Sequence, residues 1–156
     1  VEGIKDTCNK FKKNRDINNM KFKIFEGVIS DTPLYQSPHS WRSRQTKKEG
    51  DIELNSISLK KLISDYNIQF DTIIADCEGC LSNILNENEW FLNNIKLIIL
   101  EHDFNSNKDL NAFKYLMDKY NFKMKDHIKK GENGTPSINW KDGISTDDIF
   151  VSVWEK

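Results

Sequence analysis

Carboxylate side chains follow two short apolar runs of this sequence. Asp76 and Glu78 stand at the end of the first run, residues 71–77, and Glu101 closes the second, residues 95–101. Apolar runs of this length, bounded by polar residues, predict buried parallel strands. Because ligands bind beyond the carboxyl ends of the strands in open α/β sheets, we expect these carboxylates to share one site.

Acids gathered on one edge of a sheet repel one another unless a cation or a ligand compensates their charge. Carboxylate oxygens suit Mg²⁺ or Mn²⁺, so Asp76, Glu78 and Glu101 are candidate metal ligands. His102, the next residue along the chain, is a candidate general base. A plainer interpretation stays open, in which Asp76 and Glu78 cap the following helix and Glu101 and His102 form a solvated strand end.

Glu2 is a third acid at a predicted strand end. It stands ahead of a helical pattern, and the residues before that pattern look like the end of a strand whose beginning is missing. An acid in this position of a nucleotide-binding α/β unit commonly binds ribose hydroxyls. A role as a mere terminal polar residue is an equally good interpretation.

Alternating helix and strand patterns must position these residues. Helices are predicted over residues 4–18, 58–66, 79–86 and 110–120, and strands over residues 22–30, 52–57, 71–77, 95–101, 122–128 and 148–154. The alternation predicts an α/β fold: an open, mostly parallel sheet with helices on both faces, in one domain over residues 1–156. No helix separates the last two strands, which predicts an antiparallel hairpin at the C-terminal edge of the sheet.

Residues 57–104 combine a leucine-containing helix, a strand that ends in Asp76-x-Glu78-Gly79, a second helix and a strand that ends in Glu101. This order resembles the core of FkbM-type S-adenosylmethionine-dependent methyltransferases. Residues 1–30 look like the region of that family that follows its glycine-rich cofactor loop, so the resemblance covers roughly two-thirds of the chain. Two features depart from the family: the glycine-rich loop is absent, and Cys80-Leu81 replaces a second acid.

The resemblance implies a Rossmann-like class I methyltransferase sheet that lacks its first strand. It also implies transfer of a methyl group from S-adenosylmethionine to a hydroxyl oxygen of a sugar, a glycan or a related small molecule. Glu2 and Ser30 are then the expected cofactor contacts. Asp76, Glu101 and His102 are the expected catalytic residues, with Mg²⁺ or Mn²⁺ as an additional cofactor.

The long polar segment over residues 34–50 has no clean period, and loops of this length are usually functional or disordered. Within it, His39, Trp41 and Arg42 are candidate contacts to the acceptor that the resemblance implies. A solvated loop is an equally good interpretation of these residues.

Two rival functions stay open. Cys77-x-x-Cys80, placed between a strand and a helix, is also typical of a thioredoxin-like redox site, although an acid stands between the cysteines. The second rival function is that of a non-catalytic, methyltransferase-like binding module.

Composition narrows the classes of partner. The net charge of −1 argues against a nucleic-acid surface built on bulk charge, and no apolar run approaches the ~20 residues of a membrane helix. With three cysteines and no secretory pattern, we expect reduced thiols and a cytoplasmic protein.

Overall fold

The chain forms two compact units, Val1–Ile68 and Gln69–Lys156. The computed structural model describes residues 1–38, 43–77, 80–102, 104, 106–130, 136–137 and 149–156. The fold is mixed α/β. A single domain over residues 1–156 stays a prediction, because compactness alone does not decide whether a segment folds by itself.

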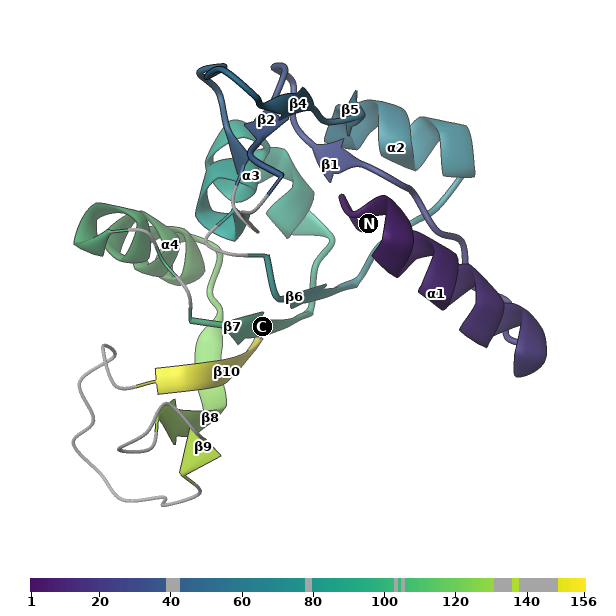
Figure 1. The fold of residues 1–156 in the computed structure, drawn as a ribbon. Helices are drawn as coiled ribbons and strands as arrows, with labels where there is room; N and C mark the ends of the chain where they lie inside the picture. Colours follow the sequence, from purple (N-terminus) through teal and green to yellow (C-terminus); the bar gives the residue numbers. More distant parts are fainter. Residues whose placement is uncertain (39–42, 78–79, 103, 105, 131–135, 138–148) are drawn as a thin grey trace. The chain divides into compact units, whose positions relative to one another are not determined.

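The first unit joins short strands to two helices (Figure 1). Strand β1 (Val28–Ile29) pairs in parallel with β5 (Ser56–Ile57), and helices α1 (Lys5–Ile17) and α2 (Leu59–Tyr66) precede and follow this pair along the chain. The sequence predicts both helices closely. Ser58 caps α2 as expected, since its side chain accepts a hydrogen bond from the Lys61 amide at 3.2 Å.

Within the predicted strand over residues 22–30, only Val28–Ile29 form a strand, and Glu26 forms an isolated parallel bridge with Glu2. Asn55 bonds the backbone at the start of β1. Its carbonyl accepts a hydrogen bond from the Val28 amide at 2.9 Å, and its side-chain amide donates to the Glu26 carbonyl at 2.7 Å. A Cβ atom at Gly27 would lie 2.1 Å from the Asn55 carbonyl oxygen. The close crossing of these two backbone segments therefore requires glycine at position 27.

A three-stranded antiparallel sheet occupies part of the segment predicted to be a loop. Its order is β3 (Ser43–Arg44), β2 (Tyr35–Gln36) and β4 (Ile52–Glu53). The Arg44 guanidinium donates to both carboxylate oxygens of Asp51, and the Lys48 amide donates to Asp51 Oδ2 at 2.8 Å. These bonds tie the β3–β4 connection together.

The second unit contains a five-stranded sheet in the order β6, β7, β10, β8 and β9. The strands are β6 (Thr72–Ala75), β7 (Leu97–Glu101), β8 (Lys123–Lys130), β9 (Pro136–Ser137) and β10 (Ile149–Glu155). Helix α3 (Leu81–Glu87) and a 3-10 helix, η1 (Glu89–Asn93), connect β6 to β7, and α4 (Asn107–Lys119) connects β7 to β8.

The prediction of a mostly parallel sheet is wrong for the described strands. Only β1–β5 and β6–β7 pair in parallel there, and the other pairs are antiparallel. The antiparallel pairing of the last two long strands, β8 and β10, is confirmed. This pair lies toward one end of the sheet: β10 is between β7 and β8, and the two-residue strand β9 lies beyond β8.

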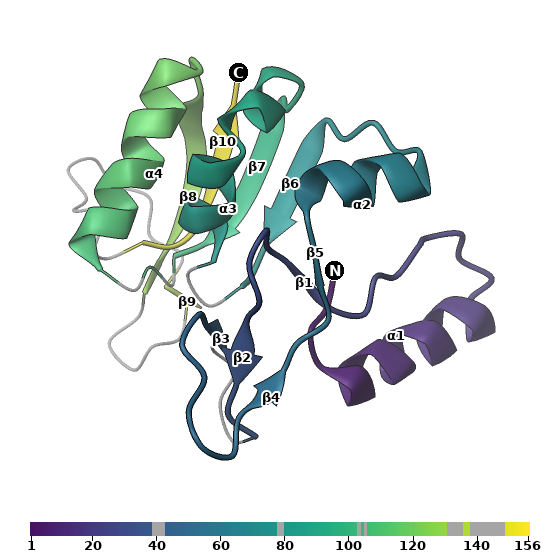
Figure 2. The same cartoon turned by 90° about the horizontal axis from the view of Figure 1, so that it is seen from above.

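Helices α3 and α4 cover the same face of this sheet (Figures 1 and 2). Phe113 of α4 is fully buried and meets the Trp154 ring of β10 edge-on at 5.6 Å. The core of the unit consists of apolar side chains from both helices and the central strands: Leu81, Leu85, Leu92, Ile95, Ile98, Leu100, Phe113, Leu116, Met117 and Trp154. This core holds the carboxyl ends of β6 and β7, where the sequence places its candidate acids.

Candidate functional site

Asp76 and Glu101 stand side by side in the register of the second unit's sheet. Ala75 of β6 pairs in parallel with Leu100 of β7, so Asp76 and Glu101 are the next residues on the two neighbouring strands. Asp76 is exposed and Glu101 is half-buried. The two carboxylates therefore lie at the same end of the sheet, as the two apolar runs predict.

His102 belongs to the opposite face from Glu101. Along β7, Ile98 and Leu100 are buried and the residues between them are half-buried, which is the alternation of a strand with one covered face. His102 continues the buried series with an exposure of 7%. Ile74 of β6 lies on the same face as Asp76 and Glu101 and is 77% exposed. This face of β6 is therefore exposed to solvent.

A buried hydrogen-bond chain occupies the His102 ring. His102 Nε2 lies 2.6 Å from Ser152 Oγ, and Trp154 Nε1 donates to the same oxygen at 2.7 Å. The ring also meets Phe104 edge-on at 5.4 Å, and the His102 backbone amide donates to the Phe150 carbonyl at 2.7 Å. These contacts join the end of β7 to β10 and direct the imidazole into the core.

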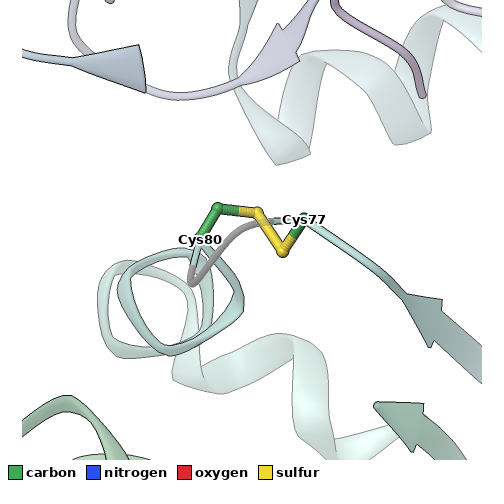
Figure 3. Close-up of a disulfide and its surroundings, with 2 residues drawn as sticks. All are labelled: Cys77 and Cys80. Carbon is green, nitrogen blue, oxygen red and sulfur yellow. A yellow bond between two sulfur atoms is a disulfide. The ribbon is translucent and has the colours of Figure 1, made fainter. Parts of the chain in front are cut away.

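A disulfide joins Cys77 to Cys80 immediately after Asp76 (Figure 3). The prediction of reduced thiols is thus wrong for this pair, because the strand-to-helix turn brings the two Cα atoms within 5.4 Å, inside the range of disulfides. The pairing agrees with the Cys-x-x-Cys alternative. Only Cys8 is a free thiol among the described cysteines.

Two of the three predicted metal ligands, Asp76 and Glu101, belong to the described residues. Glu78 lies outside the described residues, as does Asp103, and no group of three or more His, Cys, Asp or Glu side chains gathers within the described part of the chain. Asp76 and Glu101 alone remain as candidate ligands. Mg²⁺ is commonly held by one or two carboxylates and several waters, so this pair is compatible with that ion.

Glu2 lies at the start of α1, as the sequence predicts. Its Oε1 atom accepts a hydrogen bond from the Ile4 amide at 2.7 Å, and its backbone forms a parallel bridge with Glu26. Cys8, fully buried beneath, donates its thiol to the Glu2 carbonyl at 3.2 Å. Burial raises the pKa of the Cys8 thiol, and the negative charges of Glu26 and Glu2 raise it further.

Two hollows in the first unit border the predicted cofactor residues. One, of about 600 Å³, is lined by Gly3 and Ile4, which follow Glu2, and the other, of about 510 Å³, is lined by Ser30. Both volumes lie within the range of small-molecule sites, about 300–1,000 Å³. The Ser30 hydroxyl donates to the Thr32 carbonyl at 2.7 Å, which shapes the turn after β1.

The predicted acceptor contacts His39, Trp41 and Arg42 lie outside the described residues. In the same polar segment, the sequence did not predict the carboxylate of Asp51, whose side chain is buried with 2% exposure. The Arg44 guanidinium beside it holds the pKa of Asp51 below its ordinary value and raises that of Arg44. A basic residue and an acid seven positions apart in a polar segment were the only signal for this pair.

Comparisons with known proteins found no match among family models, curated proteins or solved structures. Among the described residues, no helix combines the length and the apolar character needed to cross a membrane.

Proposed function

We propose that the chain is an S-adenosylmethionine-dependent O-methyltransferase that acts on a hydroxyl group of a sugar, a glycan or a related small molecule. The observation that carries the proposal is the position of Asp76 and Glu101, which directly follow the paired residues Ala75 and Leu100 at the carboxyl ends of two adjacent parallel strands. In an open α/β sheet this is where ligands bind. The antiparallel return of β10 next to β7 also suits the class I methyltransferase sheet.

Glu2 supports the cofactor half of the proposal. Its Oε1 atom holds the start of α1, and the adjoining residues Gly3 and Ile4 border the larger hollow. A carboxylate in this position suits the paired hydroxyls of a ribose. Bound S-adenosylmethionine would supply an electrophilic methyl group, and Ser30 would contact it from the second hollow.

The two carboxylates supply the chemistry that the acceptor needs. An attacking hydroxyl becomes a better nucleophile as its proton leaves, and a carboxylate within hydrogen-bond reach can accept that proton. Asp76 is exposed and thus accessible to an acceptor, whereas Glu101 is half-buried beside it. A divalent cation held by Asp76 and Glu101 would lower the pKa of the hydroxyl.

His102 takes a positioning role in this proposal instead of the role of general base. Its ring is directed into the core and bonded to Ser152, so it fixes the end of β7 and with it Glu101. This role follows from the contacts of the ring. A base in contact with the acceptor would have to lie on the open face with Asp76.

Methyl transfer from labelled S-adenosylmethionine to a panel of mono- and oligosaccharides tests the proposal. Asp76→Asn and Glu101→Gln should each lower the rate by about 10²–10⁴-fold, the usual contribution of a positioned acid or base. Asp118→Asn, which removes an exposed carboxylate of α4, is the matched control and should leave the rate unchanged. Equal rates in all four proteins would refute the roles of Asp76 and Glu101.

A further inference from the structure

The Cys77–Cys80 disulfide begins at the residue that directly follows Asp76 (Figure 3). Cys77 follows Asp76 directly, and Cys80 is the residue before the first helical residue, Leu81. The Cys80 amide also donates to the Cys77 carbonyl at 3.1 Å. The covalent bond therefore closes one tight turn between β6 and α3.

The first turn of α3 has no side-chain cap. Cys80 occupies the N-cap position and makes no side-chain capping hydrogen bond, whereas Ser106 caps α4 through the Asp109 amide at 3.2 Å. A helix of seven residues without a cap is marginal by itself. The disulfide supplies the restraint that a capping side chain supplies elsewhere.

Reductants can reach this pair and cannot reach the third cysteine. Both Cys77 and Cys80 are half-exposed, while Cys8 is fully buried and hydrogen-bonded. Thiol–disulfide exchange requires access to a sulfur atom, so redox chemistry is confined to one place in the described chain. Asp76, the neighbour of that place, is exposed.

We propose that Cys77 and Cys80 form a reversible redox site, and that its state sets how firmly the start of α3 is held to the end of β6. The reductant is a dithiol, either a small molecule or a protein with a dithiol pair. One of its thiolates attacks a protein sulfur, which breaks the protein disulfide and forms a mixed disulfide. Its second thiolate then displaces the protein thiolate. The dithiol is oxidised by two electrons to a disulfide, and the protein gains two electrons and two protons as two thiols.

This redox site stands independently of the proposed methyl transfer. Its effect on catalysis does rest on that function, because loss of the bond between Cys77 and Cys80 would hold Asp76 less firmly beside Glu101. In that case, reduction should lower the rate of methyl transfer without abolishing the binding of S-adenosylmethionine.

The test is a redox titration of the full-length protein in mixtures of reduced and oxidised dithiothreitol, read by alkylation and peptide mass spectrometry. We expect a single two-electron transition in which Cys77 and Cys80 become alkylated together while Cys8 in the folded protein stays unmodified. Hydrogen exchange is then compared in the two states. Amides of α3 should exchange about 3- to 25-fold faster after reduction, where the upper limit reflects the restraint of a closed four-residue loop.

Helix α4 is the internal control, because its Ser106 cap is untouched by reduction and its exchange should not change. A variant with both Cys77→Ala and Cys80→Ala, which adds no capping side chain, should resemble the reduced protein in every buffer. Absence of an intramolecular disulfide at all dithiothreitol ratios would overturn the redox site. Equal exchange of α3 in both states would overturn its coupling to the turn.

Discussion

Ser152 is the residue whose replacement best tests the packing beneath the candidate site. Its hydroxyl is fully buried and bonds both His102 Nε2, at 2.6 Å, and Trp154 Nε1, at 2.7 Å. Ser152→Ala leaves two buried polar groups without this partner, and each such group costs about 1–3 kcal/mol. We therefore expect a loss of about 2–5 kcal/mol in the free energy of unfolding, which lowers the Tm by on the order of 10 °C.

The second buried serine of the same unit provides a matched control. Ser82 is also fully buried, yet its hydroxyl has no hydrogen-bond partner among the described residues. Ser82→Ala removes the same oxygen from a position where it forms no bond, so it should be neutral or slightly stabilising. Both variants and the parent are compared by thermal and urea unfolding.

A double-mutant cycle assigns the loss to the hydrogen bond with Trp154. Trp154→Phe removes the indole donor, so part of the cost of Ser152→Ala should vanish when both changes are combined. A coupling energy of about 0.5–3 kcal/mol is expected for residues in one network. If Ser152→Ala and Ser82→Ala unfold alike, or if the cycle gives no coupling, the proposed role of this network is wrong.

Two further predictions concern the first unit. The lowered pKa of Asp51 means that its carboxylate stabilises the folded state above pH ~4 and that this contribution is lost as the pH falls through the lower folded value. Thermal melts should thus show Asp51→Asn less stable than the parent at pH 7, with a difference that shrinks below pH ~4; a constant difference would contradict this. Gly27→Ala should cost more than Gly50→Ala in urea unfolding, because both glycines have a positive φ that strains alanine but a Cβ atom at Gly27 also meets the Asn55 carbonyl. Equal costs would show that the two crossing segments separate easily.

The elements with strong local patterns could be predicted from the sequence. The apolar runs before Asp76 and Glu101 are strands β6 and β7, and the capping residue Ser58 marks the start of α2. Their parallel pairing follows from the helix between them. For this reason the alignment of the two acids, the main element of the candidate site, was also predictable.

Features that depend on distant residues were not predictable. The direction of the His102 ring is set by Ser152, which lies 50 positions further along the chain. Strands β2, β3 and β4 are two residues long each, too short for an alternating pattern, and the ion pair of Arg44 and Asp51 lies in the connection between β3 and β4. The position of β10 between β7 and β8 likewise depends on pairing with strands that lie far from it in the sequence.

The disulfide was misjudged for a different reason. Three cysteines are too few for a disulfide framework, and this count favoured reduced thiols. The spacing of Cys77 and Cys80 carried the better signal, because a strand-to-helix turn brings such a pair within bonding distance.

The most direct test of the methyltransferase account is calorimetric titration of S-adenosylmethionine into the full-length protein, compared with Glu2→Gln. Glutamine keeps an oxygen for the Ile4 amide and so preserves the start of α1, but it loses the charge and one acceptor for the ribose. The account predicts saturable binding by the parent and about 10- to 100-fold weaker binding by the variant, the effect of losing one charge-assisted hydrogen bond of about 1.5–3 kcal/mol. No binding by the parent, or equal binding by both proteins, would contradict it.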